Sequence, residues 1–284
     1  MPIRERGYEH WSGQLKEKGW QGWPILTLGI GRVWKKRYAK LILSMAALPG
    51  LILLVMVIAL AKPELRIFTS QLKDIANAPT FFYHYFANGF LSLMLIITSI
   101  FSGSELISGD LHSNAFPLYF ARPLRRRDYL LAKIGTVFFF LMIPLFLPPL
   151  LALIAIFALD APLELTLQTA SGVLFLPVLL SLFFSCFTMS VSVFSRSKRF
   201  SGLIIFLVYM ASDLLGNLAS TLLNNEHYLV LSIEKNMRQA AAFIFGIKPA
   251  HSFPPYWSFL FYPLITLLCL FILDRVVRRF EAGR

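Results

Sequence analysis

Six apolar stretches, each long enough to cross a lipid bilayer as one helix, dominate this sequence. A spanning helix needs about 20 consecutive, mostly apolar residues. The stretches that approach or exceed this length are 41–61, 86–104, 134–159, 171–194, 202–223 and 256–273. The short polar connections between them leave no room for a separate soluble domain. Charged residues make up only 15% of the chain, against about 25% in soluble domains. The sequence therefore predicts an all-α membrane protein with six transmembrane helices.

The distribution of Lys and Arg predicts the orientation of these helices, because short cytoplasmic loops are enriched in both. The first 40 residues, the second and fourth connections and the C-terminal tail hold 21 of the 27 Lys and Arg residues, and the other connections hold six. We therefore expect a cytoplasmic N-terminal segment (1–40), a six-helix membrane domain (41–274) and a cytoplasmic tail (275–284). Contact with anionic lipid accounts for the net charge of +12, so nucleic-acid binding is not expected.

Three segments outside the spans have patterns of their own. PILTLGIGRVWKKRYAK (24–40) has apolar residues followed by basic ones, which predicts a short amphipathic helix in the membrane interface; an ordinary extension of the first span is the alternative. PTFFYHYF (79–86) is aromatic enough for the interfacial belt. IEKNMRQAAAFIFGI (233–247) predicts a short amphipathic or partly re-entrant helix in the long fifth connection.

Sequence motifs for chemistry are missing. The chain has no Walker A pattern, no Gly-x-Gly-x-x-Gly, no His-Glu-x-x-His and no acidic calcium loop. Its five histidines are scattered over both sides of the membrane, and Cys186 and Cys269 both lie within spans. We therefore expect no catalytic residue, no metal site, no structural disulfide and no cofactor bound directly by this chain.

Asp213 is the charged residue that lies well inside a predicted span. A carboxylate at that depth is costly, and such residues usually face the interior of a bundle or a watery cavity. Asp213, with Asn217 one helical turn later, is thus a candidate for lining a polar pathway. The alternative is helix packing, since Ser212, Asn217 and Ser220 lie on or near the same face and polar side chains hydrogen-bond between packed helices.

Prolines are frequent within the spans. Each removes a helical hydrogen-bond donor and frees the carbonyl of the residue four positions earlier. Neighbouring helices or local adjustments then have to satisfy that carbonyl. The positions are Pro49, Pro144, Pro148, Pro149, Pro177 and Pro263.

The second connection combines basic residues with apolar and aromatic ones. It reads SGSELISGDLHSNAFPLYFARPLRRRDYLLAKIG (102–135), with Glu105 at the end of the second span and a turn expected at Gly109-Asp110. Exposed apolar groups framed by basic ones mark a contact surface, which points to a protein partner inside the cell. The alternative is a segment that lies flat on the inner leaflet.

Within it, NAFPLYFARPLRRRDYLLAK (114–133) resembles the cytoplasmic loop of permease subunits of type-2 ABC transporters. A small residue, Arg-Pro-Leu, a basic residue, Asp-Tyr and a final Gly-Lys recur in that loop. Ala121 and Ala132 depart from it where serine and glycine are usual, but both keep a small side chain. The matching residues are Leu118, Tyr119, Arg122, Pro123, Leu124, Arg126, Asp128, Tyr129, Leu130 and Lys133, with Glu105 and Gly109 upstream.

This resemblance implies the permease subunit of an ATP-driven exporter in a cell membrane, the bacterial inner membrane in particular. A coupling helix, expected over 110–120, would dock on a separate ATP-binding-cassette subunit that binds ATP and Mg²⁺, so ATPase activity is not expected in this chain. A second permease copy, identical or a paralogue, would complete the pathway, and Lys133 would mark the membrane boundary. Partner-coupling roles are implied for Glu105, Gly109, Leu118, Tyr119, Phe120, Arg122, Pro123, Arg126 and Asp128.

Two other functional classes stay open. A non-transporting assembly or mechanotransmission subunit of an ABC complex would use the same loop for mechanical work. A membrane-embedded enzyme would need several polar catalytic groups that converge within the spans, and Asp213 alone does not make such a site.

Overall fold

The computed structural model describes residues 19–62, 77–113, 115, 119, 124–159, 163, 165–195, 197–249 and 251–281. The regular structure of these ranges is entirely helical. The helices are α1 (Trp23–Trp34), α2 (Arg37–Ala61), α4 (Ala78–Phe86), α5 (Gly89–His112), α7 (Arg126–Ala158), α8 (Leu167–Ser192), α9 (Lys198–Leu222), η3 (Glu226–Leu231), α10 (Ile233–Phe245) and α11 (Pro255–Glu281). Six of them, α2, α5, α7, α8, α9 and α11, are long and apolar enough to cross a membrane. The predicted all-α class with six membrane-spanning helices is confirmed.

Three of the spanning helices run past their predicted apolar stretch at the same end of the bundle. α5 ends at His112, α7 begins at Arg126 and α11 reaches Glu281. With 33 residues, α7 is roughly 50 Å long, well beyond the hydrocarbon core of about 30 Å. Hydropathy marks only the part of a helix that lies in lipid. The turn predicted at Gly109-Asp110 is therefore wrong, because both residues belong to the polar end of α5.

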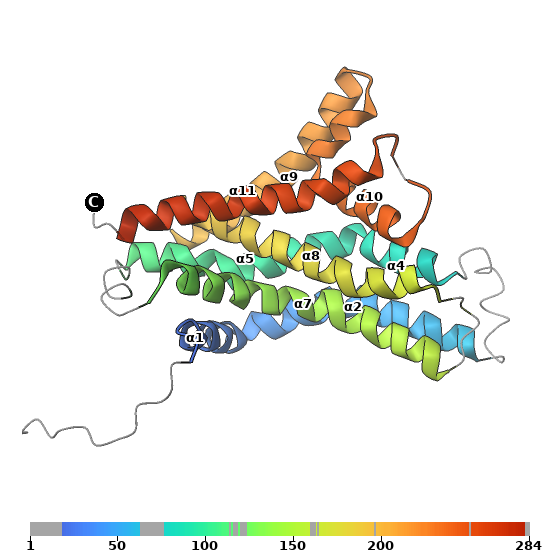
Figure 1. Cartoon of the computed structure of the whole chain (residues 1–284), viewed down its shortest axis with the longest axis horizontal. Coiled ribbons are helices and arrows are strands. Elements are labelled where there is room, and N and C mark those ends of the chain that lie inside the picture. Colours follow the sequence, from blue (N-terminus) through green and yellow to red (C-terminus); the bar gives the residue numbers. More distant parts are fainter. Residues whose placement is uncertain are drawn as a thin grey trace, which may run out of the picture.

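Helices α5 and α8 form the centre of the bundle (Figure 1). Of their most apolar windows, 67% and 72% are buried, compared with 17% for α9. α8 packs against α5, α7 and α11. Small residues allow this close packing: a Cβ added to Gly103 of α5 would lie 2.8 Å from atoms of Thr188 and Met189 on α8.

Helix α1 lies across the direction of the spans. Figure 1 shows it end-on, whereas the spanning helices beside it run from left to right across the picture. Its Gly29 packs against Thr136 of α7, where an added Cβ would lie 2.6 Å from Oγ1, while Trp23 and Leu28 stay exposed. The predicted helix is confirmed as an element separate from the first span. Its location in the membrane interface stays a prediction.

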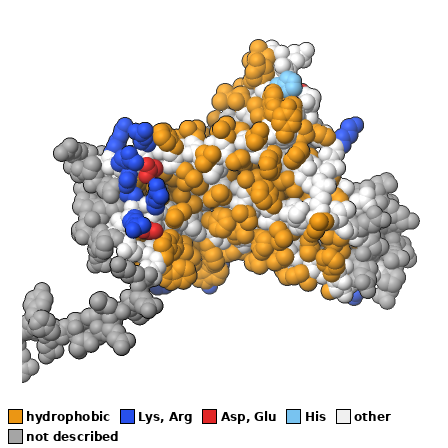
Figure 2. All heavy atoms as spheres, viewed as in Figure 1, with side chains coloured by type: hydrophobic (Ala, Val, Ile, Leu, Met, Phe, Trp, Pro, Cys, Tyr) orange, Lys and Arg blue, Asp and Glu red, His pale blue; other side chains and the backbone are white. Residues whose placement is uncertain are grey.

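Apolar side chains cover the length of the spans, and Lys and Arg gather at the end of the bundle that carries α1 (Figure 2). We name this the basic end; the ends of α1, α2, α7 and α11 that lie there carry Arg32, Lys36, Arg126 and Arg278. The last turns of α5 and α11 and the first turns of α2 and α7 lie there as well (Figure 1). The positive-inside rule predicts that this end faces the cytoplasm.

Helices α4 and α10 lie at the opposite end of the bundle, and η3 lies beside the C-terminal half of α9 (Figure 1). The prediction that the aromatic residues of 79–86 belong to an interfacial belt is wrong for most of them, because their rings pack into the protein instead of facing lipid headgroups. Two of the rings, Phe82 and Phe86, stack on Phe245 of α10. The short helix predicted in the fifth connection is confirmed as α10, which ends at the left-handed residue Gly246. The buried aromatic residues of α4 are Phe81, Phe82, Tyr85 and Phe86.

The C-terminal half of α9 stands away from the other spans (Figure 1). It contacts η3 beside it, whereas its N-terminal half begins alongside the bundle. The result is an apolar helix face that this chain leaves open. Its exposed residues include Leu207, Leu214, Leu215, Leu218 and Leu222.

Candidate functional site

Asp110 and Lys133 are the charged residues that are buried within the described part of the chain, with 8% and 4% of their surface exposed. Asp110 lies in the last turn of α5, and Lys133 lies two turns into α7. The Lys133 ammonium is 2.7 Å from Asp110 Oδ2, and the Tyr129 hydroxyl donates a hydrogen bond of 2.8 Å to the same oxygen. Tyr129 and Lys133 are four residues apart and therefore share one face of α7. We name these three residues the buried network.

The surroundings of Lys133 explain why its charge is tolerated in the interior. Its ammonium also donates to the carbonyl oxygen of Leu106 at 2.9 Å. It lies 5.4 Å and 5.9 Å from the ring centroids of Tyr129 and Tyr119. A buried ammonium needs such partners for its donors. Lys133 thus points into the bundle, and its position at the membrane boundary stays a prediction.

Sequence reasoning placed Asp110 in a turn and at the start of the coupling helix, whereas the structure places it in the last turn of α5; only Tyr129 and Lys133 were placed in the family pattern. The signal was present as a Tyr and a Lys at helical spacing, preceded by an acid at the end of the previous span. It could not be read because a turn was expected at Asp110, and a residue in a turn has no fixed direction toward the next helix.

Glu105, Gly109 and Tyr119 of the predicted coupling set lie near this network. Glu105 forms an ion pair of 3.2 Å with Lys36, a residue of the short link between α1 and α2. The Tyr119 ring packs on the Tyr129 ring with 5.3 Å between centroids. Glu105, Gly109 and Tyr119 all border one cavity, so the structure brings these three residues together.

Arg126 and Asp128 of the same set have different neighbours. The Arg126 guanidinium lies 3.6 Å from Asp274 of α11, and Asp128 accepts a hydrogen bond of 2.8 Å from the Trp20 indole. These contacts tie the first turn of α7 to the C-terminal helix and to the segment before α1. The remaining members of the set lie outside the described residues, namely Leu118, Phe120, Arg122 and Pro123.

The cavity at the basic end has a volume of about 480 Å³ and lies between α1, α5 and Tyr119. Charged and polar side chains such as Arg32, Lys36 and His112 line it together with Glu105. Burial raises the pKa of the Tyr119 phenol, Asp110 raises it further, and Arg32 opposes the rise. The cavity is therefore a polar space in which both cationic and acidic groups act.

Asp213 and Asn217 lie in the part of α9 that stands away from the bundle. The Asn217 amide donates to Asp213 Oδ2 at 3.0 Å, and the Ser232 hydroxyl donates to Oδ1 at 2.7 Å. Ser232 is the N-cap residue of α10. Oδ1 of Asp213 thus links α9 to the start of α10, while Oδ2 is held by Asn217 of the same helix, and this geometry supports the helix-packing alternative.

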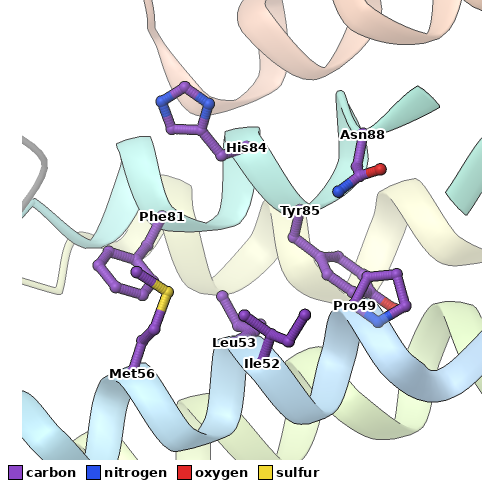
Figure 3. A pocket seen from close by; sticks show the side chains of 8 residues that line it. All are labelled: Pro49, Ile52, Leu53, Met56, Phe81, His84, Tyr85 and Asn88. Atoms are coloured by element: carbon purple, nitrogen blue, oxygen red, sulfur yellow. The ribbon is translucent and has the colours of Figure 1, made fainter. Parts of the chain in front are cut away.

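A second pocket, of about 260 Å³, opens between α2 and α4 near the opposite end (Figure 3). Apolar side chains from both helices form most of its wall, and His84 and Asn88 add polar groups. Such a lining suits an apolar group better than a charged one. The apolar and aromatic residues are Pro49, Ile52, Leu53, Met56, Phe81 and Tyr85.

Tyr85 in this pocket also repairs a defect in α7. Its hydroxyl donates a hydrogen bond to the carbonyl oxygen of Pro144. In a regular helix that carbonyl accepts from the N–H of residue 148, but Pro148 has none. A neighbouring helix therefore satisfies the freed carbonyl, as the prolines within the spans led us to expect.

Comparison with known proteins adds the family. A search of curated proteins gave no match. The sequence model of the ABC-2 family transporter proteins matches residues 33–276, a range that holds five of the six spans entirely, most of α11, and both sides of the buried network. The resemblance seen in 114–133 thus extends over most of the sequence, and this multi-pass membrane protein belongs to the ABC-2 family of transporter proteins.

Proposed function

We propose that this chain is the permease subunit of an ATP-driven exporter in the bacterial inner membrane, with both termini in the cytoplasm. A separate ATP-binding-cassette subunit binds ATP and Mg²⁺, hydrolyses the nucleotide and docks at the basic end. Family membership supports the permease role. The positive charge collected at one end of the bundle supports the orientation.

The buried network is the observation that carries this proposal. Asp110 in the last turn of α5 and Lys133 two turns into α7 lie on either side of the connection between these helices, and 2.7 Å separates their charged groups. Tyr119, from within the connection, packs on Tyr129 of the network. A partner that moves the connection therefore moves the ends of both spans. Transmission of this kind requires that the partner's two states differ in their contacts with the connection.

A second permease copy, identical or a paralogue, is the partner that we propose for the open face of α9. The exposed leucines of that face give it an apolar surface, and its half of the helix stands away from the bundle. Asp213 and Asn217 lie on the same half of α9. They are our candidates for the polar lining of a pathway between two copies, in addition to their hydrogen bonds within this chain.

Reconstitution with the ATPase subunit tests the coupling. We expect the ATPase to co-purify with the permease and its hydrolysis rate to change when the two are reconstituted in liposomes. Tyr119→Ala should preserve co-purification and abolish that change, since it removes the contact between the connection and Tyr129. Arg127→Ala is the matched control, because Arg127 is an exposed residue of α7 close to the connection.

Three outcomes would decide against parts of the proposal. Normal ATPase control by Tyr119→Ala would reject the coupling route. An absence of any ATPase partner would move the assignment toward a membrane-embedded enzyme. ATPase control that is intact while no substrate moves would favour the non-transporting assembly or mechanotransmission subunit.

A further inference from the structure

The cavity at the basic end contains one cation that no acid of the described chain balances. Glu105 pairs with Lys36 at 3.2 Å, and Asp110 pairs with Lys133 at 2.7 Å. Arg32, in the last turn of α1, also lines the cavity, and no described carboxylate lies within 4.0 Å of its guanidinium. Its charge thus remains available, and with Lys133 counted against Asp110 the groups at the cavity carry one net positive charge, which favours an anionic ligand.

The shape and donors of the cavity fit a phosphate group. Its volume of about 480 Å³ falls within the range of small-ligand pockets, about 300–1,000 Å³. The guanidinium of Arg32 offers a planar pair of N–H donors that matches two phosphate oxygens. His112 and Lys36 line the same space and add further donors. A carboxylate side chain would fill much less of the volume.

Helix α1 points to the source of the phosphate. Trp23, Leu28 and Trp34 on this helix are 60%, 70% and 46% exposed, and the exposed cations Lys35 and Arg37 follow directly. Exposed tryptophans beside cations are typical of helices that lie among lipid headgroups. The cavity lies beside this helix, so an interfacial location of α1 would bring the phosphates of the bilayer within reach of Arg32.

We propose that the cavity at the basic end binds the phosphate of an anionic phospholipid headgroup, with Arg32 as its main contact. The site needs only the membrane-inserted chain, so it does not depend on the proposed ATPase partner. A bound headgroup contacts α1 on one side and α5 on the other, and it lies next to Tyr119. Lipid composition would then set how firmly α1 is held against the connection between α5 and α7.

Titration of the delipidated full chain in detergent with phosphatidylglycerol, read by native mass spectrometry, tests this site. We expect Arg32→Gln to weaken the tightest lipid association about tenfold, the loss of one charge-assisted contact. Ser113→Phe should weaken it similarly, since Ser113 lines the cavity and the larger side chain fills it without changing charge. The matched control is Arg37→Gln, an exposed cation at the start of α2 that does not line the cavity.

The controls decide between a built site and general surface charge. An equal loss in Arg37→Gln would show diffuse attraction and overturn the proposal. Unchanged affinity in Ser113→Phe would place the lipid outside the cavity and overturn it as well. Phosphatidylcholine should bind more weakly than phosphatidylglycerol. Inorganic phosphate that displaces the lipid at equal concentration would identify a free anion as the ligand and overturn the lipid assignment.

Discussion

Replacing Lys133 by methionine removes the cation that balances Asp110 and leaves a buried carboxylate. The two side chains are only 6% and 11% exposed, so solvent screens their interaction little. Breaking a buried ion pair on one side costs about 3–5 kcal/mol of unfolding free energy. After the change Asp110 retains the Tyr129 hydroxyl as its hydrogen-bond donor. We therefore expect Lys133→Met to destabilise the protein by about 3–5 kcal/mol.

A second substitution separates the charge effect from lost packing. Adding Asp110→Asn to Lys133→Met removes the stranded charge and keeps a side-chain oxygen for Tyr129. The double variant should therefore lie within about 1–2 kcal/mol of the native protein, since neutral replacements of buried pairs are well tolerated. Unfolding of the detergent-solubilised chain by SDS, followed through its helical circular dichroism, gives these free energies.

The exposed pair of Arg278 and Asp274 supplies the control. Its atoms are 3.4 Å apart, but its side chains are 59% and 41% exposed. Arg278→Met should cost less than about 1 kcal/mol, as for other surface pairs. Two results would refute the argument that a balanced buried charge stabilises this end of the bundle. One is a loss of unfolding free energy in Lys133→Met no larger than that in Arg278→Met. The other is a double variant as unstable as Lys133→Met alone.

Three further predictions concern the rest of the molecule. Tyr85→Phe should lower the free energy of unfolding in SDS by about 1–3 kcal/mol, because it strands the Pro144 carbonyl. Asp213→Ala should speed hydrogen exchange at the start of α10, while Asp213→Asn, which keeps a side-chain oxygen, should do so less; equal effects would contradict the role of Asp213 Oδ1 as the acceptor for Ser232. Hydrogen bonds from the side chain and backbone of Ser252 hold the pKa of Glu226 below its ordinary value. These bonds therefore stabilise the fold fully when the pH is above the ordinary pKa of a glutamate, and the stabilisation is lost as the pH falls through the lowered pKa of Glu226. The protection factor of the Ser252 amide should therefore fall in acid and stay constant near neutrality.

The spans and the two accessory helices could be predicted because each depends on a local pattern. An apolar run of helix length needs no knowledge of its neighbours, and this identified all six spans. The amphipathic pattern of 233–247 predicted α10 in the same way. Helix ends were harder, because α5 continues to His112 only where its polar residues find partners on other helices.

The candidate site could be predicted only in part. The family pattern identified Tyr119 and placed it in the connection for which we propose a coupling role. It could not show that Lys133 turns inward, because that depends on the Leu106 carbonyl and on Asp110, 27 and 23 residues away along the chain. The Tyr85 contact joins residues 59 positions apart and depends on which carbonyl Pro148 frees. Pairings of this kind are set by the packing of helices and leave no local trace.

The prolines of α7 have a mechanical consequence. Pro144, Pro148 and Pro149 remove three backbone donors within two turns, and this region begins about 16 Å along the helix from Lys133. A helix bends most easily where its hydrogen-bond ladder is interrupted. Tilting of the end of α7 that carries Lys133 is therefore absorbed at these prolines. The rest of the helix, which the Tyr85 hydroxyl of α4 contacts at the Pro144 carbonyl, can stay in place.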